Sequence, residues 1–295
     1  MAVGQPVAVA PGVRRILAPN PGMMTGPGTN TYLVGDEEVA IIDPGPDDPD
    51  HLAAIVAAVG GSIRWILVTH THIDHSPLAA ALQTATGAPT LGFGPAPSLS
   101  VPGLDGHDRG FVPDRVLGDG DRLDGREFSL GAVHTPGHAS NHLCFELVGD
   151  GLLFSGDHVM QGSTVVIAPL DGDMSEYLES LDKIQRMGLR RIAPGHGHII
   201  EDPAAALDEY RRHRLAREAA IAALVAPVGP GDPVTIEQLV EAIYTDVPDH
   251  LHPIARYSVW AHLRKLAAEG TAVSADLGDI SAPWWARDSE VARRG

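Results

Sequence analysis

A run of six residues, His70-Thr71-His72-Ile73-Asp74-His75, holds the densest group of metal-binding side chains in the sequence. It follows the apolar segment 63–69, which we expect to be a strand. Side chains two positions apart in an extended segment point the same way, so His70 and His72 can bind one ion. Asp74 and His75, which we expect to begin the next helix, offer a carboxylate and an imidazole to a second ion. The run therefore predicts a metal centre with nitrogen and oxygen ligands, a mixture that zinc accepts.

Three later segments each place a histidine or an aspartate next to a glycine, directly after an expected strand. They are Thr135-Pro136-Gly137-His138, Ser155-Gly156-Asp157-His158 and Pro194-Gly195-His196-Gly197-His198. Glycine allows a tight turn and a close approach of the backbone, and open α/β sheets gather their functional loops at the carboxyl ends of strands. One such segment alone would indicate only a loop. Together with the run at 70–75, the three segments predict one shared site.

These segments, in this order, resemble the metallo-beta-lactamase superfamily in its glyoxalase-II-like pattern. The resemblance covers about residues 10–200, and it implies an α/β fold, the αββα sandwich, with two divalent metal ions. Carried over residue by residue, it implies a first ion on His70, His72 and His138. It also implies a second ion on Asp74, His75 and His196, with Asp157 bridging the two.

The only cysteine, Cys144, lies in an expected strand, where we predict a buried structural thiol. No cysteine stands at a ligand position, which departs from the classical antibiotic-hydrolysing zinc enzymes. Other hydrolytic activities are therefore expected ahead of β-lactamase activity. Metal affinities favour zinc over manganese or iron at a histidine-rich site, so zinc is the expected metal.

Two neighbouring cations lower the pKa of a shared water towards ~7 and stabilise charge on the attacking and leaving oxygens. We therefore expect hydrolysis in which a metal-bridging hydroxide attacks a phosphoryl or an acyl centre. Asp74 and Asp157 are the expected catalytic residues. Asp74 would also orient the nucleophile, and Asp157 would fix the spacing of the ions.

Three neighbours of these ligands have two interpretations each. Asp43 follows an expected strand and either accepts a hydrogen bond from a ligand imidazole or only forms a turn before Pro44. His142 and His158 either contact the substrate or are hydrogen-bonded structural histidines.

Short β-branched runs separated by glycine, proline and aspartate dominate the first 160 residues. The expected strands are 30–34, 39–42, 63–69, 128–134, 143–148, 152–155 and 191–193. Helical patterns lie at 49–59, 76–86 and 175–187, and Asp48 is the expected N-cap of the first helix, with Pro49 at its first position. Such a mixture suits helices that cover the faces of sheets.

The segment 227–233, rich in proline and glycine, predicts a boundary between a catalytic domain at 1–226 and a C-terminal domain at 227–295. A long helix at 203–225 precedes this boundary. After it we expect a helix from Thr235, a turn at Asp246-Val247-Pro248, a helix at 253–269 and a strand at 271–274. This order resembles a small winged-helix module. The alternative is a helical cap or a dimerisation arm, and such an arm would make the protein a homodimer.

Further segments resemble the lactamase-beta-2-like branch of the superfamily. Among them are Gly28-Thr29-Asn30-Thr31-Tyr32-Leu33-Val34, Asp43-Pro44-Gly45-Pro46 and Tyr244-Thr245-Asp246-Val247-Pro248. Some members of that branch cut single-stranded RNA, so the resemblance implies an endonuclease of the endoribonuclease type. The same ligands also occur in thioesterases and lactonases, which makes a small acyl ester the alternative substrate. A third hypothesis, a nucleic-acid-binding regulator without catalysis, does not explain the complete ligand set.

The chain has 295 residues and a formal net charge of −17. This charge disfavours a long interface with nucleic acid, where affinity comes largely from lysine and arginine. The one dense basic run, at residues 211–217, is either a solvated helix face or a path for a polyanion. No apolar stretch approaches the roughly 18 residues that cross a bilayer, and residues 1–13 lack the features of an export signal. We therefore expect no membrane partner and a cytoplasmic location.

Overall fold

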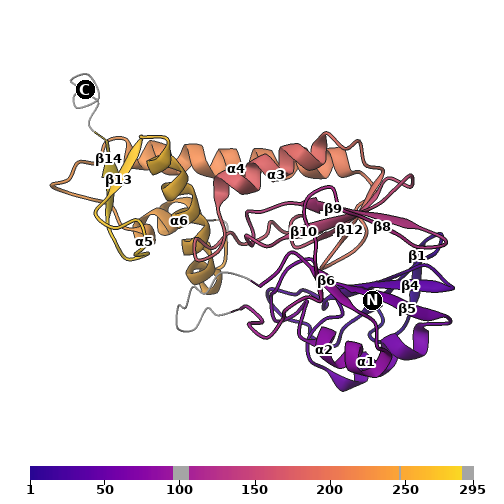
Figure 1. Ribbon diagram of the computed structural model, residues 1–295. Coiled ribbons are helices and arrows are strands. Elements are labelled where there is room, and N and C mark those ends of the chain that lie inside the picture. Colours follow the sequence, from indigo (N-terminus) through magenta and orange to yellow (C-terminus); the bar gives the residue numbers. More distant parts are fainter. Residues whose placement is uncertain (96–105, 246, 288–295) are drawn as a thin grey trace.

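Two β-sheets packed face to face form most of the computed structural model, which describes residues 1–95, 106–245 and 247–287 (Figure 1). The first sheet has seven strands in the order β1-β2-β3-β4-β5-β6-β7. Their bounds are β1 Val7–Ala10, β2 Val13–Leu17, β3 Asn30–Val34, β4 Glu38–Ile42, β5 Ser62–Leu67, β6 Thr90–Gly92 and β7 Arg115–Val116. Because β4 to β7 run parallel to one another, their carboxyl ends lie at one edge.

The second sheet has five strands in the order β12-β11-β10-β9-β8. Their bounds are β8 Arg122–Asp124, β9 Ser129–His134, β10 Leu143–Leu147, β11 Leu152–Gly156 and β12 Arg191–Pro194. Strand β10 is antiparallel to both β9 and β11, and β12 is parallel to β11. The carboxyl ends of β9, β11 and β12 therefore also meet at one edge.

Two helices cover the outer face of each sheet. Helices α1 (Pro49–Ala58) and α2 (Leu78–Thr86) pack on the first sheet, and α3 (Met174–Gln185) and α4 (Pro203–Val225) pack on the second. Helix α1 begins as predicted, because the Asp48 side chain accepts a hydrogen bond from the backbone N–H of His51 at 2.8 Å. The layers follow the αββα order that the sequence predicts.

Apolar side chains fill the space between the two sheets. Tyr32 and Leu67 of the first sheet pack in one cluster with Phe145 and Phe154 of the second, and the rings of Tyr32 and Phe154 lie 5.1 Å apart. Strand β4 is buried on both faces. Ile42 packs in the layer between the two sheets, whereas Ile41 packs in the layer beneath α1 and α2. Burial on both faces explains why such strands are continuous apolar runs in the sequence.

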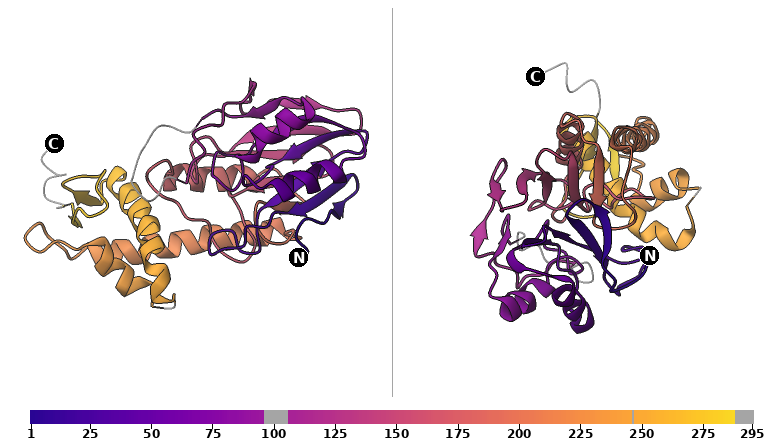
Figure 2. Two further views of the ribbon diagram at one scale, coloured as in Figure 1. Left: turned by 90° about the horizontal axis from the view of Figure 1, so that it is seen from below. Right: turned by 90° about the vertical axis from the view of Figure 1, so that its right-hand side faces the viewer.

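The C-terminal module lies beside the sandwich, and α4 reaches from one to the other (Figure 2). It consists of α5 Ile236–Ile243, a 3-10 turn at Asp249–Leu251, α6 His252–Ala268, and the antiparallel pair β13 Ala272–Ser274 and β14 Trp284–Ala286. Thr235 and Gln238 form a reciprocal capping box that begins α5. Two helices followed by a strand are the expected arrangement, and β14 completes a two-stranded wing. Asp246, part of the turn expected between the helices, lies outside the described residues.

The last turns of α4 also belong to the core of this module. Ile221 and Val225 share one apolar cluster with Trp284, whose side chain is fully buried. The helix therefore contributes to both units, and the boundary expected at 226/227 stays a prediction. Among the described residues, no helix combines the length and the apolar character that a membrane crossing requires.

Two boundaries near the metal-binding run differ from the sequence-based expectation. Strand β5 ends at Leu67 and not at residue 69, and α2 begins at Leu78 after Pro77. Asp74 and His75 therefore lie in a turn before the helix, closed by a hydrogen bond from the His75 N–H to the His72 carbonyl at 2.9 Å. Sequence patterning also misses β1, β2, β6, β7, β8 and β14, most of which have only two to four residues.

Candidate metal centre

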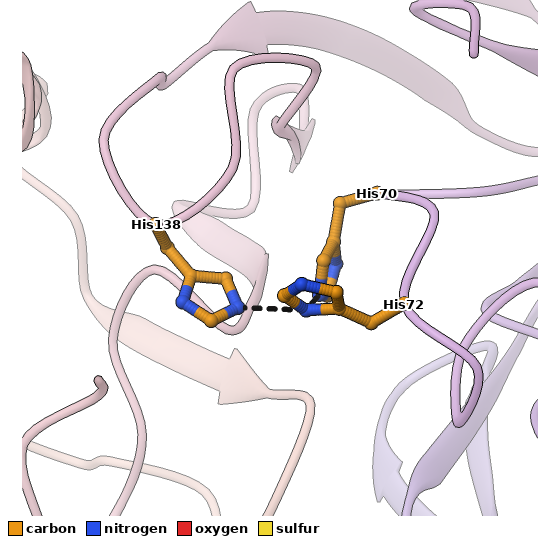
Figure 3. A group of neighbouring side chains, drawn as sticks. All are labelled: His70, His72 and His138. Atoms are coloured by element: carbon orange, nitrogen blue, oxygen red, sulfur yellow. Dashed lines mark hydrogen bonds between the residues drawn. The ribbon is translucent and has the colours of Figure 1, made fainter. Parts of the chain in front are cut away.

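Three histidine side chains from two loops meet at one point (Figure 3). His70 and His72 come from the loop after β5, and His138 comes from the loop after β9. The Nδ1 atom of His72 lies 2.9 Å from Nε2 of His70 and 3.0 Å from Nε2 of His138. The three ligand atoms lie within 4.8 Å of one another, which is close enough to bind one ion.

A second group lies beside the first and consists of Asp74, His75 and His196. The Oδ2 atom of Asp74 is 3.3 Å from Nε2 of His75 and 3.1 Å from Nε2 of His196. Asp157 lies between the two groups. Its Oδ1 atom is 3.4 Å from Nε2 of His75 and 3.3 Å from Nε2 of His196, whereas its Oδ2 atom is 3.9 Å from Nε2 of His138. The structure thus brings together all the side chains that the resemblance implies as ligands.

Glycine residues allow the strand ends to approach one another at this centre. A Cβ atom at Gly195 would lie 2.6 Å from Oδ1 of Asp157 and 2.8 Å from Cε1 of His75. Gly156 has a φ of +47°, and a Cβ atom there would lie 2.6 Å from Oγ1 of Thr69. Only residues without a side chain fit these positions, which explains why glycine precedes both Asp157 and His196.

Hydrogen bonds fix the outward-facing nitrogen of four of the histidines. Nδ1 of His70 lies 3.0 Å from Oγ1 of Thr69, and Nδ1 of His75 lies 2.9 Å from Oδ2 of Asp43. Nδ1 of His138 lies 2.8 Å from the Val166 carbonyl, and Nδ1 of His196 lies 3.1 Å from the Gly28 carbonyl. Each bond leaves Nε2 of the same ring directed into the site. Metal-ligating histidines commonly have such partners, which fix the ring orientation.

Asp43 makes the contact that the sequence analysis expects of it. Besides the bond to His75, its carboxylate accepts hydrogen bonds from the backbone N–H and the hydroxyl of Thr69, both at 2.8 Å. In the described part of the chain, Asp43 is the only residue other than glycine with a positive φ, 51°. Such backbone conformations are costly and cluster at functional sites. Asp43 is therefore both the turn residue and the support of a candidate ligand.

The side chains of the centre fit divalent cations. Nε2 of His75 and Oδ1 of Asp157 are buried and lie 3.4 Å apart, but neither makes a hydrogen bond of good geometry, which is unfavourable unless another group satisfies them. Burial and neighbouring imidazoles lower the pKa of His70 and His72, so both rings are neutral and offer a lone pair. Burial alone would raise the pKa of Asp157, but His196 and His75 hold it well below its usual range. The carboxylate therefore stays ionised.

A family model described as the metallo-beta-lactamase superfamily matches residues 24–196, more than half of the chain. The chain belongs to the metallo-beta-lactamase superfamily. Residues 235–284 match the beta-lactamase associated winged helix domain. The superfamily domain is therefore followed by a winged-helix module, as the sequence analysis predicts.

Relatives of this superfamily member extend over both units. The beta-lactamase-like protein 2 homolog of Drosophila melanogaster is 33% identical over 267 residues, which cover 88% of each chain. The atrochrysone carboxyl ACP thioesterase of Aspergillus chevalieri is 35% identical over 256 residues, which cover 82% of this chain and 76% of that protein. A beta-lactamase domain protein from Burkholderia ambifaria has a TM-score of 0.80 at 23% identity, with 97% of this chain and 94% of that chain covered. This last likeness shows the fold alone.

His142 and His158, for which the sequence leaves a substrate contact and a structural role open, are fully buried behind the centre. Nδ1 of His142 lies 2.9 Å from the Thr135 hydroxyl, and the ring of His158 packs 4.8 Å from that of Tyr177. Burial lowers the pKa of both histidines, that of His158 to about 3, so both rings are neutral. Neither ring is accessible to solvent. The structure therefore supports the alternative, structural histidines, and gives no support to a substrate contact.

His107 contacts the centre of this superfamily member although no motif points to it. Its ring lies 4.6 Å from that of His72, and its Nε2 atom lies 3.7 Å from Oδ2 of Asp171. Backbone hydrogen bonds from Ile73 to Gly106 at 2.8 Å and from Asp108 to Thr71 at 2.6 Å pair segment 106–108 with the metal-binding run. In the sequence, the pair His107-Asp108 is the only hint of this contact. Unlike the other segments of the centre, it does not follow an expected strand.

Proposed function

We propose that this superfamily member is a hydrolase that uses two divalent metal ions, with zinc as the expected metal. The position of Asp157 carries the proposal, because its two carboxylate oxygens face the two ligand groups. A single structural ion would need neither a second group nor a shared carboxylate. The complete set of side chains also argues against a regulator that only binds nucleic acid.

The ligands of the first ion would be His70, His72 and His138, those of the second would be Asp74, His75 and His196, and Asp157 would be shared. Two such ions lower the pKa of water towards ~7 and act as Lewis acids on the scissile group. The side chain of Asp74 is 21% accessible to solvent, compared with 11% for Asp157. Asp74 is therefore the more accessible of the two carboxylates, and it would orient incoming water as a hydrogen-bond acceptor. The hydroxyl of Thr29, 3.4 Å from Oδ2 of Asp74, helps to hold this carboxylate.

The proposed substrate is a thioester or another activated acyl ester. A relative that is 35% identical over most of the chain is named a thioesterase. Each arginine of the basic run on α4 pairs with a group of the protein, the exposed Arg212 with Glu209 of the same helix. Arg214 is buried and donates to the Val165 carbonyl, Arg217 donates to the Ile243 carbonyl at 2.6 Å, and Arg211 pairs with Asp182 at 3.4 Å. These arginines are therefore poorly placed to guide a polyanion, which agrees with the net charge of −17.

Cleavage of single-stranded RNA is the second candidate function. The winged-helix module favours it, since residues 235–284 match a domain of that class. Folds of this class do not fix function by themselves, and the acidic surface weakens the electrostatic contribution on which RNA binding depends.

The test incubates zinc-loaded protein with a panel of acyl thioesters and lactones and, separately, with single-stranded RNA. We expect acyl hydrolysis and a fall of more than about 100-fold in Asp157→Asn, because the shared ligand loses its charge. The control is Asp47→Asn, which changes an exposed aspartate outside the centre. Cleavage of RNA without acyl hydrolysis would contradict the acyl substrate and support the nuclease function instead. No hydrolysis of either class by protein with two bound zinc ions would contradict the proposed function.

A further inference from the structure

A pocket of about 270 Å³ lies beside the metal centre and shares His196 with it. Four of the six methionines of the chain line it, Met1, Met23, Met24 and Met160, together with the polar side chains of Gln161, Ser163 and His198. Pockets that enclose whole ligands measure ~300–1,000 Å³, so this volume suits one part of a substrate whose reacting group lies at the metals. We propose that the pocket binds the acyl chain of the substrate and that this chain is a flexible aliphatic one. The inference rests on the proposed function.

The loop between β2 and β3 carries one wall of this pocket at a fixed place. It folds back on itself through hydrogen bonds from the Gly22 N–H to the Gly26 carbonyl at 3.1 Å and from the Thr25 hydroxyl to the Asn20 carbonyl at 2.6 Å. Its base is tied to the centre, because the Gly28 carbonyl pairs with Nδ1 of His196. Met23 and Met24 are therefore held next to the candidate ligand.

A second part of the wall, at Met160, is fastened to α4. Met160 follows β11 and the candidate ligand Asp157, and its backbone N–H donates to the hydroxyl of Tyr210 at 2.8 Å. The same hydroxyl lies 2.8 Å from the Met160 carbonyl and donates to it. Both parts of the wall thus have an ordered backbone, and adaptation to a ligand is left to the methionine side chains.

Exposure and side-chain chemistry indicate what the pocket binds. Met23 and Met24 are 62% and 53% exposed, so they contribute little to the protein core, and an apolar ligand would remove them from water. Methionine is unbranched and polarisable and adapts to irregular shapes. A wall of such side chains suits a chain that changes conformation better than it suits a rigid polar group. Because His196 borders the pocket, an acyl group that reacts at the metals places its hydrocarbon part there.

The test compares kcat/KM of the zinc-loaded full-length protein on octanoyl and acetyl thioesters of N-acetylcysteamine. We expect wild type to prefer the octanoyl substrate. The double variant Met23→Ser, Met24→Ser should lower the octanoyl-to-acetyl ratio about tenfold, because two apolar contacts with the chain are lost. Met23→Leu, Met24→Leu should restore most of the preference. The matched control is Val116→Ser, which removes a 63% exposed apolar side chain outside the pocket lining and should not change the ratio.

A ratio in the serine double variant equal to that of Val116→Ser would overturn the inference. If wild type hydrolyses no thioester, the proposed function fails. The assignment of the pocket to an aliphatic chain is then tested by ligand binding without catalysis. In titration calorimetry, octanoate should then bind wild type more tightly than the serine double variant. Equal binding to both proteins, or no binding to wild type, would overturn the pocket assignment.

Discussion

Asp43 links the turn after β4 to the metal centre through a single buried carboxylate. It accepts hydrogen bonds from Thr69 and pairs with Nδ1 of His75, and its backbone adopts the left-handed conformation. An acceptor at this place fixes the orientation of the His75 ring and directs Nε2 into the site. The residue would therefore act on a metal ion at this centre through His75 and not by direct contact.

We expect Asp43→Asn to weaken zinc binding and lower hydrolytic activity by about 10–100-fold, the usual effect of removing a partner of a metal ligand. Asparagine tolerates the left-handed conformation about as well as aspartate, so the variant removes one acceptor without adding backbone strain. Zinc affinity is measured by competition with a chelator. Asp47→Asn is the control in the same turn, and equal affinities for the two variants would contradict the role of Asp43.

The side chains of the centre could be predicted because histidine, aspartate and glycine recur there at fixed spacings after strands. Thr69 and His107 could not, since they contact the centre through hydrogen bonds and ring packing that leave no periodic pattern. The sequence leaves the role of His142 open between a substrate contact and a structural histidine. His142 lies four residues after His138, but nothing in that spacing tells whether its ring faces the opening or the core.

The loops after β11 and β12 can approach each other at the centre only because glycine stands at residues 156 and 195. The backbone at Gly195 lies so close to the centre that a Cβ atom would approach Oδ1 of Asp157 to 2.6 Å. The loop can avoid that contact only by moving the shared carboxylate or His196.

We expect Gly195→Ala to destabilise the fold by about 1–3 kcal/mol, the usual cost of overpacking, and to reduce the zinc content of the purified protein. Gly229→Ala is the matched control, because a Cβ atom there meets nothing within 4 Å. Thermal unfolding and elemental analysis measure the two effects. Normal zinc content in Gly195→Ala would show that the close approach is not required.

Helices α4 and α6 are joined by a partly buried carboxylate. Glu218 lies 3.1 Å from Nδ1 of His262 and accepts a hydrogen bond from Nζ of Lys265 at 2.8 Å. Partial burial would raise the pKa of Glu218, but His262 and Lys265 lower it below its ordinary value of 4.5. Because the pKa of Glu218 is lower in the folded state, its ionised carboxylate stabilises the fold at pH values above about 4.5. This contribution is lost as the pH falls through the pKa of the folded state.

Glu218→Gln should therefore lower the free energy of unfolding by about 1 kcal/mol at neutral pH, a charged hydrogen bond discounted for its partial exposure. The difference from wild type should narrow as the pH falls below 4.5. Urea unfolding at a series of pH values measures it, with the exposed Glu241→Gln on α5 as control. A difference that stays constant with pH would contradict the assignment.

Elements with strong patterns could be predicted almost to the residue, as β3 and α4 show, because burial on both faces or a clear cap and break define them. The short strands β6 and β7 could not be predicted. They have three and two residues, and they exist because the edge of an already formed sheet offers hydrogen bonds. Such pairing depends on neighbours far away in the sequence.

For the whole molecule, the C-terminal module and the metal centre share a loop. Arg264 of α6 donates to the Pro169 carbonyl at 3.0 Å, and Leu170 packs against the core of the module. The same loop provides the Val166 carbonyl that holds His138. The module therefore supports the metallo-beta-lactamase domain whether or not it binds a substrate, and composition alone could not show this contact.

The central claim is that two cations are bound side by side with Asp157 shared between them. Anomalous diffraction at the zinc edge from crystals of the zinc-loaded protein tests it most directly. The account predicts two peaks about 3.5–4 Å apart, one among His70, His72 and His138 and the other among Asp74, His75 and His196, with an oxygen of Asp157 bound to each. A single peak, or two peaks of which Asp157 contacts only one, would contradict it.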